Sequence, residues 1–213
     1  MSTSVSRRRF LALSGGTAAG GVFLAACGDD DDSDSTTSAM SESTTTMADQ
    51  DALAQFGEGD LGIVNYALTL EYIEAAFYAD VVASGLFKGD DLALIKEIGG
   101  NEDEHVVALE ATAKQLGTPA PKPKTQFPIE GPQQVLELAA TVENLGAAAY
   151  LGQAGAIQSK EILDAALSIH SVEGRHAAAL NTLTGQTFVP DGPFAVPAGA
   201  SEVLESVQPF LAS

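Results

Sequence analysis

Two four-residue stretches decide the fold of this chain, Glu102-Asp103-Glu104-His105 and Glu173-Gly174-Arg175-His176. Both have the pattern Glu-x-x-His, and they contain two of only three histidines in the 213 residues. A lone glutamate precedes each copy at nearly the same distance, since Glu71 lies 31 residues before the first copy and Glu143 lies 30 residues before the second. A single Glu-x-x-His is a common pair on a helix surface. The doubled pattern with matched upstream glutamates instead indicates a structural repeat.

This pattern also indicates a chemistry. One Glu from each of two helices, plus one Glu-x-x-His from each of two others, is the ligand set of a carboxylate-bridged di-metal centre in a four-helix bundle. Carboxylates and imidazoles suit iron, and manganese would accept the same donors. We therefore expect two iron ions, with manganese as the alternative, held by Glu71, Glu102, His105, Glu143, Glu173 and His176. The zinc-protease pattern His-Glu-x-x-His does not occur in the sequence.

The spacing predicts an all-α fold, an antiparallel four-helix bundle made of two helical hairpins joined by a long crossover. The midpoints of the two glutamate pairs fall in segments 84–90 and 152–159, which carry turn residues. We expect helices over about 60–82, 90–116, 132–152 and 159–183, with Asp60 as an N-cap and Gly117 as a C-cap. The proline-rich segment 118–131 is the expected crossover.

Smaller features complete this map. Gly99-Gly100 predicts a kink or a close helix crossing just before the first Glu-x-x-His. After Gly185 three prolines keep the chain irregular. Ser201 is the expected cap of a short last helix that packs on the bundle through Val203, Leu204, Val207 and Phe210.

The first 27 residues have the features of a targeting segment. The stretch Ser6-Arg7-Arg8-Arg9-Phe10-Leu11 fits a twin-arginine export signal. An apolar stretch follows it, and Leu24-Ala25-Ala26-Cys27-Gly28 resembles the lipobox of bacterial lipoproteins. We expect export by the twin-arginine route and lipidation at Cys27, which anchors the protein to the outer face of the bacterial cytoplasmic membrane. An uncleaved membrane anchor and a free Cys27 thiol are the alternatives.

Amino-acid composition limits what the rest of the chain can form and bind. Residues 28–50 are rich in Asp, Ser and Thr, so we expect an acidic flexible tether. Residues 51–213 form one domain with a C-terminal extension, holding 22 of the 29 acidic and 7 of the 10 basic residues, a net charge of −15. We expect no binding to nucleic acid, because phosphate recognition needs basic patches.

The two halves also resemble each other over 68–78 and 140–150, and each half has a tyrosine seven residues after its lone glutamate, Tyr78 and Tyr150. These residues and the two Glu-x-x-His stretches resemble the ferritin-like superfamily, and within it a single-domain exported family related to plant desiccation-related proteins. The resemblance spans about residues 55–211. It implies that the six residues named above are di-iron ligands and that both tyrosines hydrogen-bond to them.

Three further residues lie near the ligands in the sequence. His170 stands three residues before Glu173 and is a candidate for an extra ligand or for a contact that orients one. Glu74 and Glu104 have Gly146 and Arg175 as their counterparts in the repeat, so we expect both at the surface.

The resemblance implies a metal-binding protein that oxidises ferrous iron or reduces oxygen or peroxide. A metal-binding or stress-protective module without significant turnover is the alternative, and a metal-free bundle is a third reading. No cage-forming signature is evident, so a storage shell is not implied, and the sequence leaves the oligomeric state open.

Overall fold

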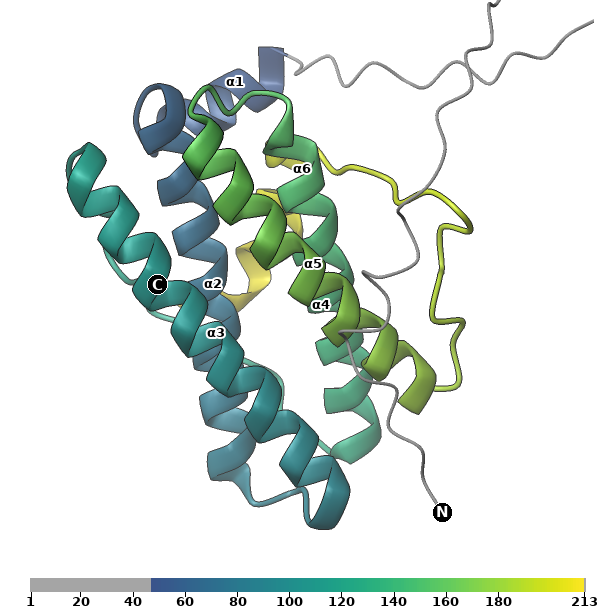
Figure 1. Cartoon of the computed structure of the whole chain (residues 1–213). Helices are drawn as coiled ribbons and strands as arrows, with labels where there is room; N and C mark the ends of the chain where they lie inside the picture. Colours follow the sequence, from purple (N-terminus) through teal and green to yellow (C-terminus); the bar gives the residue numbers. More distant parts are fainter. Residues whose placement is uncertain (1–46, 213) are drawn as a thin grey trace, which may run out of the picture. The chain divides into compact units, whose positions relative to one another are not determined.

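The computed structural model describes residues 47–212, and these form helices without any strand (Figure 1). The export signal, Cys27 and tether residues 28–46 lie outside the described residues. The elements are α1 (Met47–Ala54), α2 (Gly59–Ser84), α3 (Gly89–Leu116), α4 (Pro132–Ala154), α5 (Lys160–Leu183), α6 (Ala200–Val207) and a 3₁₀ turn η2 (Gln208–Phe210). The predicted all-α bundle is therefore confirmed.

The four long helices form the two expected hairpins, because α2 packs on α3 and α4 packs on α5 (Figure 1). Helix α2 also contacts α4, which joins the hairpins. Gly85 ends α2 in the left-handed region at φ 71°, where glycine has no steric penalty. Pro132 opens α4, where its missing N–H is not needed.

The close crossing expected at Gly99 is present. Helix α3 runs without a break through Gly99-Gly100, so there is no interruption there. A Cβ atom at position 99 would lie 2.8 Å from Cβ of Tyr78 on α2. The glycine thus lets α2 and α3 approach closely beside a tyrosine that reaches into the bundle.

The expected cap at Asp60 is wrong, because α2 begins after Glu58 and Asp60 lies inside its first turn. The Asp60 carboxylate instead accepts hydrogen bonds from the backbone N–H groups of Gln158 and Ser159, both at 2.8 Å. These donors lie in the α4–α5 turn, so the side chain ties the start of one hairpin to the turn of the other.

The expected cap at Ser201 is also wrong. Helix α6 follows Gly199, and both the backbone N–H and the hydroxyl of Ser201 donate to Oδ1 of Asp49 at 3.0 Å. The buried Asp49 belongs to α1, which begins at Met47 and so lies partly within the segment expected as tether. A carboxylate at a helix N-terminus is favourable, and this one joins α1 to α6.

The crossover 118–131 contains no helix, and side-chain and backbone contacts hold it to other parts of the domain. The Asn65 side chain fixes its beginning, donating to the carbonyl of Thr118 at 3.1 Å and accepting from the N–H of Ala120 at 2.8 Å. Further along, Thr125 forms an isolated antiparallel bridge with Leu211. The crossover is therefore held at its beginning and near its middle.

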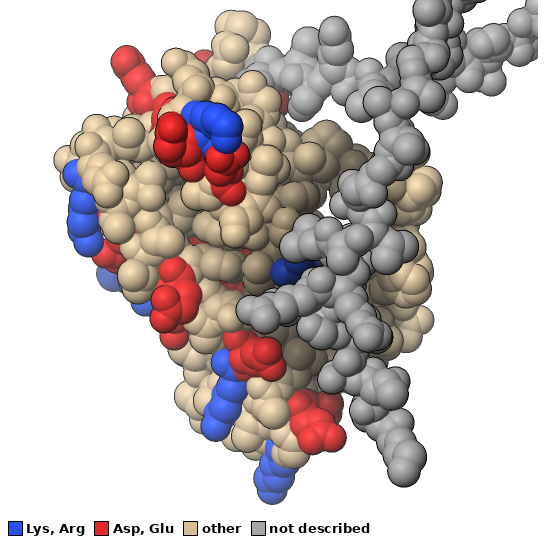
Figure 2. All heavy atoms as spheres, viewed as in Figure 1, with Lys and Arg blue, Asp and Glu red and all other residues tan. Residues whose placement is uncertain are grey.

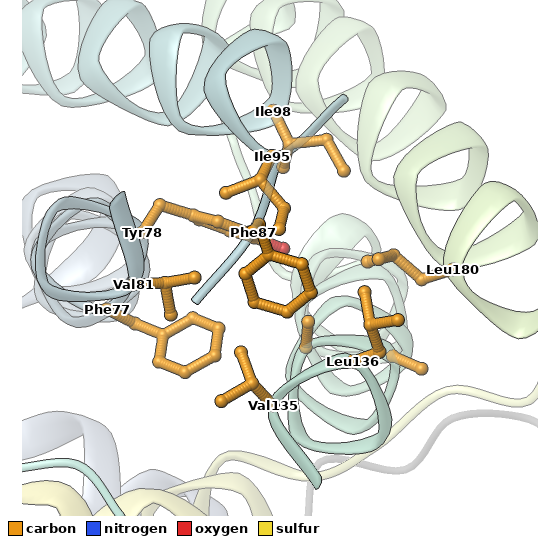
Figure 3. Packing of buried hydrophobic residues seen from close by; sticks show 11 residues of the cluster. Phe77, Tyr78, Val81, Phe87, Ile95, Ile98, Val135, Leu136 and Leu180 are labelled. Atoms are coloured by element: carbon orange, nitrogen blue, oxygen red, sulfur yellow. The ribbon is translucent and has the colours of Figure 1, made fainter. Parts of the chain in front are cut away.

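Two apolar layers fill the bundle on either side of the glutamates. One layer gathers Phe77, Val81, Ile95, Leu136 and Leu180 from all four long helices and Phe87 from the α2–α3 turn (Figure 3). The other gathers Val64, Leu68, Leu109 and Ile169. Residues 71, 102, 143 and 173 fall between these layers along their helices, so the layers keep water from the glutamates.

The surface carries mixed charges. Figure 2 shows Asp and Glu side chains spread over one face with Lys and Arg side chains between them. Among residues 47–212, no helix is long and apolar enough to cross a membrane.

Candidate metal centre

The six side chains predicted as ligands meet at one point in the bundle. Helices α2 and α4 supply Glu71 and Glu143, and each remaining helix supplies one Glu-x-x-His. The four glutamates have no solvent exposure, while the side chains of His105 and His176 are 11% and 7% exposed. A helical spacing of three places Glu and His of each pair on one face, which here is the face turned to the bundle axis.

These side chains form two overlapping groups that could each hold a metal ion. Glu71, Glu102, His105 and Glu173 make the first, and Glu102, Glu143, Glu173 and His176 make the second. Within each group, one ligand atom from every residue lies within 4.8 Å of the others. Glu102 and Glu173 belong to both groups. The geometry therefore separates two shared carboxylates from two terminal ones, Glu71 and Glu143.

Both imidazoles turn Nδ1 toward the carboxylates. Nδ1 of His105 lies 3.2 Å from Glu71, 3.0 Å from Glu102 and 3.3 Å from Glu173. Nδ1 of His176 lies 3.0 Å from Glu102 and 3.1 Å from Glu143. Each imidazole thus faces one terminal and at least one shared carboxylate.

Two tyrosines cross between the hairpins to the terminal carboxylates. The Tyr78 hydroxyl on α2 donates to Oε1 of Glu143 on α4 at 2.5 Å, and the Tyr150 hydroxyl on α4 donates to Oε1 of Glu71 on α2 at 2.6 Å. The hydrogen bonds expected of both tyrosines are therefore present. In both terminal carboxylates, Oε1 accepts the hydrogen bond from the tyrosine, and Oε2 lies close to Nδ1 of the histidine in the same hairpin.

A comparison with known protein families agrees with this arrangement. Residues 59–186 match the family described as Ferritin-like domain. The chain belongs to this family. The match begins at the first residue of α2 and ends three residues after α5, so it covers the four helices that supply the site. A search of curated proteins found no match.

Glu74 is a fifth buried glutamate of this ferritin-like domain, and its expected surface position is wrong. It is 3% exposed. A Cβ atom at position 146 would lie 2.9 Å from Oε1 of Glu74 and 2.9 Å from Oε2 of Glu173. Gly146, its counterpart in the repeat, leaves the space that both carboxylates occupy. The spacing of three from Glu71 and the missing side chain at 146 were the available signals.

His170 does not join the site. Its Nδ1 lies 3.0 Å from the carbonyl oxygen of Ala147 on α4, and it belongs to neither metal-binding group. Ile169, Glu173 and His176 occupy the inward face of α5, and position 170 is turned about 100° away from Ile169. Glu104 is exposed on α3, as expected.

Asn101 is a site residue that sequence reasoning missed. Its side-chain nitrogen Nδ2 lies 3.0 Å from Nε2 of His176, on the ring edge opposite the carboxylates. Such a contact fixes the ring orientation and selects which nitrogen carries the proton. If Nδ1 binds a metal ion, Nε2 carries the hydrogen, and the amide must then present its oxygen. The residue directly precedes Glu102, but nothing in its own position signalled the contact.

Burial and mutual repulsion set the protonation of the metal-free cluster. Burial raises the pKa of Glu71 to about 8 and raises those of Glu74, Glu143 and Glu173 above the ordinary value. Burial also acts on Glu102, but hydrogen bonds from His105 and His176 outweigh it and lower the pKa of Glu102 to about 2. Against its own burial, the surrounding carboxylates raise the pKa of His176 to about 9.

The residues fit a pair of cations. Both oxygens of the fully buried Glu173 lack a hydrogen-bond partner among the described residues, although Oε1 lies 3.3 Å from Nδ1 of His105. Leaving a buried carboxylate unsatisfied is costly. Cations held by the two groups would compensate the buried carboxyl groups, which only two imidazoles balance otherwise.

Proposed function

We propose that this chain binds two iron ions per molecule in a carboxylate-bridged centre. The observation that carries the proposal is the membership of Glu102 and Glu173 in both metal-binding groups. Two groups that shared no residue would fit two independent sites. Two groups that share two carboxylates fit ions close enough to be bridged, which is the arrangement that ferritin-like bundles build from Glu and Glu-x-x-His.

The donor set favours iron. It comprises carboxylates and imidazoles without any thiolate, and this mixture suits iron, with manganese as the alternative. When bound, a pair of ferrous ions would supply two electrons to one molecule of oxygen or peroxide, or would themselves be the iron that is oxidised. The proposed activity is therefore oxidation of ferrous iron or reduction of oxygen or peroxide.

The chain's own residues would prepare the site for this chemistry. Tyr78 and Tyr150 hold one oxygen of each terminal carboxylate, which leaves the other oxygen directed at the centre. Asn101 orients the His176 ring. The apolar layers above and below limit the entry of water, and a dry site strengthens every charge interaction within it.

Metal content and oxygen consumption test these proposals in sequence. The protein is purified from its own cells, its metals are measured, and the iron-free form is then loaded with ferrous iron anaerobically. Consumption of oxygen or peroxide faster than by the same concentration of free ferrous ion supports the oxidase. Two tightly bound ions without accelerated consumption support the alternative, a metal-binding or stress-protective module with no significant turnover.

The proposed place of action is the outer face of the cytoplasmic membrane, reached by the twin-arginine route. It rests on the sequence of residues 1–27 and on Cys27, all outside the described residues. Mass spectrometry of the membrane fraction should find a mature chain that begins at lipidated Cys27. Cys27→Ala should release the folded domain into the soluble fraction, and an unmodified soluble form in wild-type cells contradicts the anchor.

A further inference from the structure

A cavity lies in the bundle beyond the metal centre, on the side away from the α2–α3 turn. Its wall includes Val64 of α2, Leu109 of α3, Tyr150 of α4 and Ile162 and Ala166 of α5. The empty space is about 510 Å³ up to and including its mouth. No Asp, Glu, Lys or Arg lines it, so the pocket favours an uncharged, mainly apolar occupant.

Two residues of the pocket's wall, Tyr66 and Gln153, each carry an unsatisfied buried polar atom. The Tyr66 hydroxyl and Oε1 of Gln153 have no hydrogen-bond partner within residues 47–212, although these side chains are 1% and 4% exposed. Such groups usually have a partner, because each one left alone costs about 1–3 kcal/mol. Burial first, and then Asp49 and Glu74, raise the pKa of Tyr66, so its hydroxyl stays protonated.

The two atoms differ in what they require. Oε1 of Gln153 can only accept a hydrogen bond, whereas the Tyr66 hydroxyl can donate one. A single hydroxyl group on a bound molecule can do both tasks, by donating to Gln153 and accepting from Tyr66. A carboxylic acid would lose its proton in neutral solution, and its anion would meet the field of the five buried glutamates.

We propose that this pocket binds a small uncharged alcohol or phenol, with its hydroxyl at Tyr66 and Gln153 and its hydrocarbon part among the aliphatic side chains. The pocket has a physical link to the metal centre, because Tyr150 lines it and donates to Glu71 at 2.6 Å. A bound molecule would therefore lie one side chain away from a terminal carboxylate. Binding does not require metal, so the proposal stands or falls separately from the proposed function.

Fluorine NMR on the purified full-length chain without metal tests the proposal with three probes. We expect 4-fluorophenol to bind saturably and at least tenfold more tightly than fluorobenzene, which has the same ring without the hydroxyl. We expect no binding of 4-fluorobenzoate. Equal affinities for the first two probes, or no saturable binding of 4-fluorophenol, would overturn the proposal.

Variants locate the binding in this pocket. Gln153→Leu should remove the preference for 4-fluorophenol, and Ala166→Phe, at the half-buried edge, should weaken binding of both ring probes at least tenfold. Gln158→Leu makes the same chemical change at an exposed position outside the pocket and should change nothing. If Gln153→Leu unfolds, Tyr66→Phe takes its place, because it removes the other hydrogen-bond partner of the probe's hydroxyl. Unchanged binding in the pocket variants with retained helicity would contradict the site.

Discussion

Tyr78 and Glu143 lie on different hairpins, 65 residues apart in the sequence, and the tyrosine hydroxyl donates to the buried carboxylate at 2.5 Å. Tyr150 and Glu71 repeat this contact in the opposite direction at 2.6 Å. The two halves of the bundle therefore fix each other's terminal carboxylates. A ligand set that comes from all four helices can keep its geometry only if the hairpins are held in register, and these two bonds do so at the site itself.

Removal of either hydroxyl should therefore disturb the site without emptying it. Tyr78→Phe and Tyr150→Phe should each lower the stability of the metal-free protein by about 1–3 kcal/mol, because a buried carboxylate oxygen loses its donor. Both variants should still bind two ions but should change the oxidation rate. Denaturant unfolding, metal analysis and ferrous oxidation kinetics check this. Unchanged stability in both variants would show that the hydroxyls do not support the carboxylates.

The terminal and shared carboxylates should differ in metal stoichiometry. Glu71→Gln and Glu143→Gln each remove a ligand from one group only, so each variant should retain about one ion. Glu102→Gln and Glu173→Gln each affect both groups and should lose both ions. Glu104→Gln is the control, because Glu104 is exposed on the same helix as Glu102 and should leave two ions bound. The same number of bound ions in all four site variants would contradict the distinction between shared and terminal ligands.

Glu74 should behave as part of the centre. Burial and the neighbouring carboxylates disfavour the ionised form of Glu74. Glu74→Gln removes this ionisable group, so it should stabilise the metal-free protein at the high pH where Glu74 ionises, and it should weaken binding of at least one ion. Gly146→Ala should impair metal binding too, because its Cβ would lie 2.9 Å from the oxygens of Glu74 and Glu173. Thermal melts of the metal-free form and metal titrations check both variants. If Glu74→Gln kept the stability and the metal affinity of the wild type, the Glu74 carboxylate would not interact electrostatically with the site.

The stability of the metal-free protein should fall as pH rises from about 5 to about 9. Burial raises the pKa of Glu71 from 4.5 to about 8, and the carboxylates raise that of His176 from 6.5 to about 9. A group whose pKa is higher in the folded than in the unfolded protein stabilises the fold fully at pH values below its unfolded pKa. This stabilisation is lost as pH rises through its folded pKa. The pKa of Glu102 is lowered from 4.5 to about 2, so its contribution to stability is lost only as pH falls below 4.5.

Bound metal should remove this dependence, because ligation displaces the protons. Metal affinity should therefore increase with pH over the same interval. Melting temperatures of both forms at several pH values provide the measurement. A metal-free melting temperature that stayed level or rose from pH 5 to 9 would contradict the protonation pattern.

The hairpins and six candidate ligands were predictable because they depend on spacing within the chain. A pair of glutamates about 30 residues apart around a turn must lie level on antiparallel helices, and Glu-x-x-His must occupy one face. The repeat placed a tyrosine seven residues after each lone glutamate, but the hydrogen bonds of these tyrosines were expected from the resemblance to ferritin-like proteins.

The remaining features depend on contacts between distant elements. Glu74 is buried because Gly146 on another helix leaves room for it, and His170 turns away from the site because Ile169 and Glu173 already occupy the inward face. Asp49 and Asp60 look like ordinary acidic residues near helix starts, yet each holds backbone donors of another element. Sequence spacing does not reveal such partners.

The number of metal ions in the protein isolated from its own cells decides most directly whether the chain holds a metal pair. Elemental analysis of the wild-type chain beside Glu102→Gln, both purified without added metal, gives that number. We expect about two ions per chain, mainly iron, in the wild type and almost none in Glu102→Gln. A wild-type protein without iron or manganese, or one that held the same metal after the loss of Glu102, would contradict it.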